Sequence, residues 1–265
     1  MRRSFAARAG RLALAAAAAA CGGQAATTPA PENAPALTSA TALVGAMHDR
    51  YEGKWYRTLT FVQRNTRYVA SGTDTSTWLE AVRIPGALRI DYEPLAKRNG
   101  ILFVRDSQFL MANGLVTNAT ASVHPLMVLG FDVYADAPDR TLARLRSLGF
   151  DLAKFRQDTW QGRPAYVVGA AAGDLEARQF WVDRERLVFV RLIQPGREPG
   201  RTSEIRFDDY RPLGGGWIAP TVRFLTAGRE TFLERYEDIR ADVALDDRLF
   251  DPRQWSAAPH WRVAR

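Results

Sequence analysis

Alternating apolar and polar positions run through most of the chain, and the stretch Ala87–Tyr92 shows them most clearly. Its side chains Leu88 and Ile90 share one face, whereas Arg89 points to the other. A period of two residues is what a half-buried antiparallel strand requires, so we expect Leu88 and Ile90 to face the interior and Arg89 to lie in solvent. Glu93-Pro94 ends the strand, because proline has no N–H group to donate to a neighbouring strand.

The same alternation recurs in short runs that are separated by turns. About six strands are expected between residues 55 and 121, and five or six more between residues 155 and 242. A curved antiparallel sheet of about eleven strands is too large to stay flat and tends to curl into an open or half β-barrel. The predicted fold class is therefore mainly β (α+β).

Helical spacing of apolar residues appears at two places. Residues 38–51 carry Leu43, Val44 and Met47 on one face, with Thr38 or Ser39 as a possible N-cap. Residues 123–133 and 138–148 read as a pair of helices inserted between the two groups of strands. Because their apolar stripes need a partner, we expect the inserted helices to cover the concave face of the sheet as a lid.

The first 37 residues do not read as part of the folded domain. Residues 1–20 have a basic start and a short apolar run, which is typical of a secretory signal peptide. Small residues directly before Cys21 resemble a bacterial lipobox, in which the cysteine is lipidated after cleavage. Cys21 is the only cysteine in the chain, which rules out an internal disulfide. The alternative is an ordinary signal peptide with an incidental cysteine.

Residues 22–37 contain Gly, Pro, Ala and Thr with almost no large apolar side chain, so they are expected to form a disordered tether behind the anchor. Gly22 after the cysteine favours the outer membrane, by resemblance to enterobacterial lipoproteins. The expected organisation is a signal peptide (1–20), a lipidated cysteine and tether (21–37), one folded domain (38–255) and a loose tail (256–265).

Charge and chemistry exclude several classes of function. The net charge is +7, but without the four arginines of residues 1–20 there are 32 basic and 29 acidic residues, scattered along the chain. This pattern does not favour nucleic acid as a partner. The three histidines, His48, His124 and His260, do not stand at metal-ligand spacing, so neither a metal site nor a cofactor is expected. No Gly-x-Ser-x-Gly motif is present, although a triad assembled in space cannot be read from sequence.

Several short motifs resemble the outer-membrane lipoprotein sorting (LolA/LolB-like) superfamily. They are Pro85–Ile90 with Tyr92 and Pro94, Asp106-Ser107 before Phe109, Gly162–Ala165, Phe180–Asp183, Arg191 and Leu249–Pro252. The resemblance spans roughly residues 38–255. It implies an open β-barrel that holds a hydrophobic cavity under a helical lid and binds lipid acyl chains, either to carry lipoproteins or to sense them. The helical insert at 123–148 and the expected anchor set this chain apart from the small soluble carriers.

A set of apolar residues is expected to line the cavity, with a filled core as the alternative. The set is Leu59, Phe61, Trp78, Leu88, Ile90, Met111, Met127, Phe180, Val188, Val190 and Leu192. Arg57 falls on the same alternating face as Phe61, so it is a candidate contact for a lipid head group. The alternatives for Arg57 are an ion pair with Glu80, or a register that leaves its side chain in water.

These expectations define the predicted function. The favoured hypothesis is a non-enzymatic lipoprotein of the outer membrane that faces the periplasm and binds lipid or lipoprotein acyl chains in a hydrophobic cavity. The alternatives are a protein-interaction module of the cell envelope without lipid cargo, and an enzyme. The sequence identifies neither the ligand nor the client protein.

Overall fold

A computed structural model describes residues 36–196, 198 and 200–262 of the chain. The predicted signal peptide, Cys21 and the tether up to residue 35 lie outside the described residues. Within them, thirteen antiparallel strands form one sheet in the order β6-β5-β4-β3-β2-β1-β15-β14-β11-β10-β9-β8-β7. The sheet is not closed, because β6 and β7 lie at its two ends. This is the mainly β, open half-barrel that the alternation predicts.

The thirteen strands of this sheet include Ala87–Tyr92, with the bounds that alternation predicts. They are β1 (Thr58–Val69), β2 (Gly72–Arg83), β3 (Ala87–Tyr92), β4 (Gly100–Val104), β5 (Ser107–Ala112), β6 (Leu115–Ala121), β7 (Phe155–Trp160), β8 (Arg163–Val168), β9 (Gln179–Asp183), β10 (Val188–Pro195), β11 (Thr202–Asp208), β14 (Thr221–Thr226) and β15 (Arg229–Ala241). A separate two-stranded sheet consists of β12 (Arg211–Leu213) and β13 (Gly216–Ile218). β13 and β14 are thus separated by only two residues, although they belong to different sheets.

The two halves of the chain meet at the centre of the sheet, where β1 pairs with β15. Val62 lies opposite Glu237 and Gln63 lies opposite Tyr236 in this pair. The strands that follow β1 in sequence extend the sheet on one side, and β14 to β7 extend it on the other.

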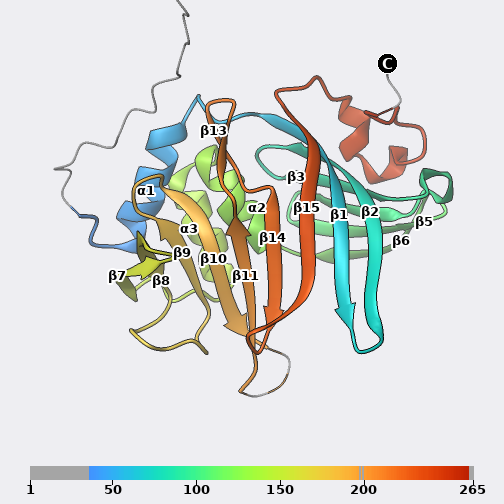
Figure 1. Ribbon diagram of the computed structural model, residues 1–265. Coiled ribbons are helices and arrows are strands. Elements are labelled where there is room, and N and C mark those ends of the chain that lie inside the picture. Colours follow the sequence, from blue (N-terminus) through green and yellow to red (C-terminus); the bar gives the residue numbers. More distant parts are fainter. Residues whose placement is uncertain (1–35, 197, 199, 263–265) are drawn as a thin grey trace, which may run out of the picture.

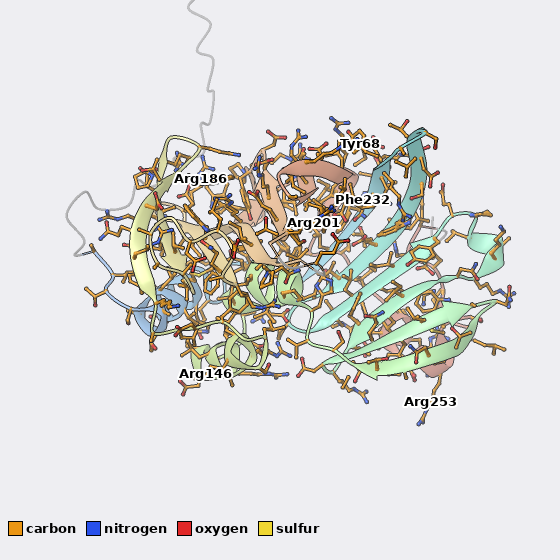
Figure 2. The ribbon with its side chains drawn as sticks, turned by 90° about the horizontal axis from the view of Figure 1, so that it is seen from below. Tyr68, Arg146, Arg186, Arg201, Phe232 and Arg253 are labelled. Atoms are coloured by element: carbon orange, nitrogen blue, oxygen red, sulfur yellow. The ribbon has the colours of Figure 1, made fainter. Side chains whose placement is uncertain are left out.

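Three helices lie together on one side of the sheet; in Figure 1 the two green ones lie behind β10 and β11, and the first, blue, lies to their left. They are α1 (Ala40–Tyr51), α2 (Pro125–Gly130) and α3 (Pro138–Ser147). Ser39 caps α1, since its Oγ accepts a hydrogen bond from the N–H of Ala42 at 3.1 Å. Seen from below in Figure 2, the strands bend around α2 and α3, so these helices lie inside the curve of the sheet. No described helix has the length and apolar character needed to cross a membrane.

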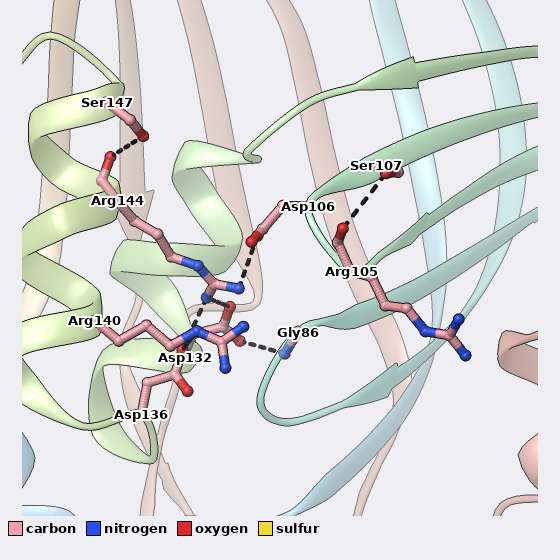
Figure 3. Close-up of polar contacts among 9 residues, drawn as sticks. All are labelled: Gly86, Arg105, Asp106, Ser107, Asp132, Asp136, Arg140, Arg144 and Ser147. Atoms are coloured by element: carbon pink, nitrogen blue, oxygen red, sulfur yellow. Dashed lines mark hydrogen bonds and ion pairs between the residues drawn. The ribbon is translucent and has the colours of Figure 1, made fainter.

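Arg144 of α3 fixes the helical insert to two turns of the sheet (Figure 3). Its guanidinium donates to Asp106 at 2.7 Å, to Asp136 at 2.8 Å and to Asp132 at 3.1 Å. The other oxygen of Asp132 accepts a hydrogen bond from the N–H of Gly86, between β2 and β3. Burial raises the pKa of Asp132 to about 6, even though Arg144 and the Gly86 N–H favour the charged form. The insert is thereby held in one position relative to the β4–β5 turn and the β2–β3 turn.

The face of β3 that sequence alternation places in solvent is buried, so the expectation of a solvated Arg89 is wrong. Arg89 is 3% exposed, and its Nε donates to Asp91 at 2.7 Å. Its guanidinium carbon lies 3.7 Å from the centroid of the Trp255 ring. The reason is the C-terminal segment, red in Figure 1, which covers this face through the short helices η3 (Asp247–Phe250) and η4 (Pro252–Gln254). Alternation identifies the two faces of a strand, but it cannot tell that a distant segment covers the second one.

The C-terminal segment builds a second, smaller core on that face. Leu249, Phe250 and Trp255 pack there with buried side chains of β2 to β5, including Met111. Ala258 and Trp261 also pack against this core. The described part of the predicted tail, residues 256–262, is therefore folded onto the domain rather than loose.

Candidate ligand-binding cavity

A cavity of about 290 Å³ opens between the concave face of the sheet and the segment around α2. Its walls come from β1, β2, β3 and β4 on one side, and from β11, β14 and β15 on the other. The lining residues are Phe61, Gln63, Trp78, Glu80, Val82, Leu88, Ile90, Ile101, Phe103, His124, Leu126, Met127, Phe131, Phe207, Phe224, Phe232, Glu234 and Tyr236.

The lining follows directly from the period of two in each strand. Trp78, Glu80 and Val82 are alternate residues of β2, and Phe232, Glu234 and Tyr236 are alternate residues of β15. The ladder places Phe61 opposite Glu80 and Gln63 opposite Tyr236, so these side chains gather on the same face of three adjacent strands.

Aromatic rings make up much of the wall. The ring centroids of Phe61 and Tyr236 are 4.2 Å apart, and those of Phe224 and Phe232 are 5.6 Å apart. Trp78, Phe224 and Phe232 are only half-buried although they belong to the apolar lining. Covering apolar surface of this kind with a ligand lowers the free energy, because the surface is removed from water.

A group of polar side chains interrupts this apolar wall, and we call Gln63, Glu80, Glu234 and Tyr236 the carboxyl cluster. Glu80 is 4% exposed and Glu234 is 8% exposed. The hydroxyl of Tyr236 donates to Oε2 of Glu234 at 2.8 Å. Nε2 of Gln63 donates at 2.7 Å to Oδ1 of Asn65, the next residue on the same face of β1.

Burial changes the protonation of the carboxyl cluster. Desolvation raises the pKa of Glu234 to about 7, although the hydrogen bond from Tyr236 favours its ionised form. Desolvation, together with the charge of Glu234, raises the pKa of Glu80 well above its usual range. Burial and the neighbouring Glu234 likewise raise the pKa of Tyr236. Both carboxyls are therefore shifted toward their protonated forms, and Glu234 is close to its midpoint at neutral pH.

His124 is the third titratable type in the lining, and it is also neutral. It stands at the N-cap of α2, where its Nδ1 accepts a hydrogen bond from the N–H of Met127 at 3.3 Å. Burial lowers the pKa of His124 to about 4. Every titratable lining group is thus shifted toward its uncharged form, which suits a site for an apolar ligand.

The expected lining residues separate into two sets in the structure. Phe61, Trp78, Leu88, Ile90 and Met127 line the cavity. Leu59, Phe180, Val188, Val190 and Leu192 belong to the filled main core, and Met111 lies in the core on the opposite face of the sheet. The division arises because the main core also takes in the buried faces of α1 and α3, which pack with the strands of the second half of the sheet.

Arg57 does not lie in the cavity. Its side chain is exposed, and it precedes β1, where its N–H donates to Oδ1 of Asp242 at 2.8 Å. Sequence reasoning missed Gln63, Glu234 and Tyr236 as lining residues. The signal that could have found them is a carboxylate at the alternate position between two aromatic residues, as in Phe232, Glu234 and Tyr236.

Comparison with known proteins identifies the fold. No family model matches the chain, and no curated protein matches it by sequence. Among solved structures, a domain from Vibrio parahaemolyticus named for outer membrane lipoprotein sorting has a TM-score of 0.55 at 12% identity, and the match covers 81% of this chain and 97% of that one. A LolA superfamily protein from Nitrosomonas europaea has a TM-score of 0.51 at 13% identity, with 81% and 98% covered.

A third similar structure is a DUF1329 family protein from Desulfovibrio piger, with a TM-score of 0.53 at 12% identity, covering 80% of this chain and 95% of that one. The domain therefore has a LolA-like fold over nearly the whole length of these neighbours. At this level of identity the likeness describes the architecture of the protein.

Proposed function

We propose that the domain binds an acyl chain of a lipid or lipoprotein in the cavity and acts as a non-enzymatic carrier or sensor. The observation that carries the proposal is the hollow left between the sheet and α2, whose wall is largely aromatic and aliphatic. Neighbours named for lipoprotein sorting and for the LolA superfamily share the architecture that creates this hollow, which supports the same kind of ligand here.

The size of the cavity sets an upper limit on affinity. A methylene group is about as large as a water molecule, whose share of liquid volume is about 30 Å³. A cavity of about 290 Å³ thus takes on the order of ten methylene groups. At about 0.8 kcal/mol for each buried methylene, the gross gain is roughly 8 kcal/mol, which corresponds to a dissociation constant near 1 μM before the costs of immobilisation.

The cellular setting is part of the proposal. Lipidation of Cys21 would anchor the chain in the outer membrane, and the tether would present the domain to the periplasm. The carboxyl cluster offers no cation to an anionic head group, so an anionic head group stays outside the cavity while the acyl chain enters.

Native mass spectrometry of the purified chain tests the proposal. Replacing the expected anchor cysteine, Cys21→Ser, ensures that any lipid found is non-covalent cargo. A bulky side chain in the lining, Ile101→Trp, should reduce the lipid-bound fraction several-fold, because it fills space that the acyl chain needs. Val116→Trp adds the same bulk at an exposed position of β6 and should leave binding unchanged. A folded protein that carries no lipid and takes none up from vesicles would favour the interaction module instead.

A further inference from the structure

Glu80 is a buried carboxyl group without a hydrogen-bonding partner. It is 4% exposed and lines the cavity, in the second half of β2. No group in the described part of the chain donates a hydrogen bond to it, and Glu234, Tyr92 and Tyr236 are the polar side chains close enough to interact with its charge. Buried polar groups in folded proteins are almost always paired, so this one requires an explanation.

Two polar side chains near Glu80 direct hydrogen bonds to other residues. The hydroxyl hydrogen of Tyr236 is directed to Glu234, and an amide hydrogen of Gln63 is directed to Asn65. The amide of Asn65 in turn donates to Oγ of Ser76 at 3.3 Å. Among the described residues that line the cavity there is no lysine or arginine. Glu234 thus already accepts a hydrogen bond from Tyr236, whereas no hydrogen bond within the described residues reaches Glu80. A donor group of a bound ligand can therefore pair with Glu80 and with the remaining lone pairs of Glu234.

We propose that the cavity binds an amphiphile whose polar group is an aliphatic ammonium, received between the carboxyls of Glu80 and Glu234 while its alkyl part lies against the aromatic wall. This inference rests on the proposed function, since it assumes that an apolar chain enters the cavity, and it adds the chemistry of the polar group.

The donor inventory favours an ammonium over other head groups. An ammonium carries three N–H donors and no acceptor, which is the complement of two carboxyl groups. A hydroxyl supplies a single donor, and a carboxylate or phosphate supplies only further acceptors and a repulsive charge. Hydrogen bonds between ionised partners are about twice as strong as neutral ones, and the apolar surroundings strengthen them further.

Proton release provides a signature of this binding mode. Glu234, with its pKa of about 7, holds its proton at pH 6, and burial shifts Glu80 toward its protonated form as well. An ammonium stabilises the ionised forms of both carboxyls. The other titratable groups near them do not change charge at that pH. Burial lowers the pKa of His124 to about 4, while burial and the charge of Glu80 raise the pKa of Tyr92 to about 12. Tyr236, on β15, is also shifted away from neutral pH.

Isothermal titration calorimetry with three ten-carbon probes tests the inference on the full chain. Decylamine, decanol and decanoate have the same alkyl part and differ only in the polar group. At pH 8, decylamine should bind at least about tenfold more tightly than decanoate, and Glu80→Gln should reduce this preference to about threefold or less. Glu237→Gln is the matched control, because it removes the same charge from β15 at an exposed residue.

The possible results separate the inference from the proposed function. Equal binding of all three probes would overturn the ammonium site and leave the acyl-chain proposal standing. If none of the probes binds to the folded protein, both proposals are wrong. If Glu80→Gln does not fold, proton release by the unmodified chain still tests the ammonium site. Titration of decylamine at pH 6 in two buffers of different ionisation enthalpy should show release of roughly one proton or more, and no release would refute the site.

Discussion

The carboxyl of Glu234 should make the domain less stable as the pH rises, and the variant Glu234→Gln should remove this effect. The glutamine has nearly the same shape, and its carbonyl oxygen can still accept the hydrogen bond from Tyr236. The substitution therefore changes the ability to ionise and little else in the cavity wall.

The magnitude follows from the two pKa values. Desolvation raises the pKa of Glu234 from 4.5 to about 7 in the folded state. Below pH 4.5 the carboxyl is protonated in both states and carries no penalty. Between pH 4.5 and 7 the unfolded chain loses the proton while the folded protein keeps it, so the free energy of unfolding falls by about 1.4 kcal/mol per pH unit. The total loss is on the order of 3 kcal/mol and is complete above pH 7.

Urea denaturation of both proteins at pH 4.5 and at pH 8.5 measures this effect. The quantity to compare is the free energy of unfolding of Glu234→Gln minus that of the unmodified chain. This difference should be roughly 3 kcal/mol larger at pH 8.5 than at pH 4.5. Glu237→Gln, with an exposed carboxylate on the same strand, should show no such pH-dependent difference. If this difference in the free energy of unfolding is the same at both pH values, Glu234 is not a buried carboxyl that retains its proton.

Two further predictions concern the buried arginines. Arg89→Met should destabilise the domain by about 3 kcal/mol, because it leaves Asp91 buried without its guanidinium partner, and thermal unfolding measures the loss. A variant as stable as the unmodified chain would show that the C-terminal segment seals β3 by apolar contact alone. Arg144→Met should cost about 3 kcal/mol or more in urea denaturation, since Asp132 stays buried. Arg140→Met, at a largely exposed neighbour on α3, should cost less than about 1 kcal/mol, and an equal loss in both variants would contradict the role assigned to Arg144.

The sequence predicts the strands well because a half-buried antiparallel strand has a strict period of two. β3 has the bounds that alternation gives, and α3 lies within the helix expected at 138–148, with Pro138 at its start and Gly149 just after it. Five of the eleven expected lining residues line the cavity. The remaining six are buried elsewhere, because burial on a face does not tell whether a helix, a ligand or the C-terminal segment covers that face.

The polar groups were harder to place than the apolar ones. A charged residue in or next to a strand has three physical outcomes: an ion pair, exposure to solvent, or burial as an unpaired group. Arg57, Arg89 and Glu80 show one outcome each, since Arg57 is exposed, Arg89 pairs with Asp91, and Glu80 stays unpaired within the cavity. Which outcome occurs depends on contacts with residues far away in the sequence.

The pairing of β1 with β15 also determines when the cavity can exist. Gln63 and Tyr236 meet there from opposite ends of the folded chain, so the carboxyl cluster is assembled from both ends. A chain that emerges from the N-terminus first has β1 and β2 long before β15 is available, and contacts between such distant segments form slowly. During that interval the apolar face of β1 and β2 is uncovered. The last strand therefore completes the cavity, and until it arrives the nascent domain exposes the surface that the finished protein reserves for its ligand.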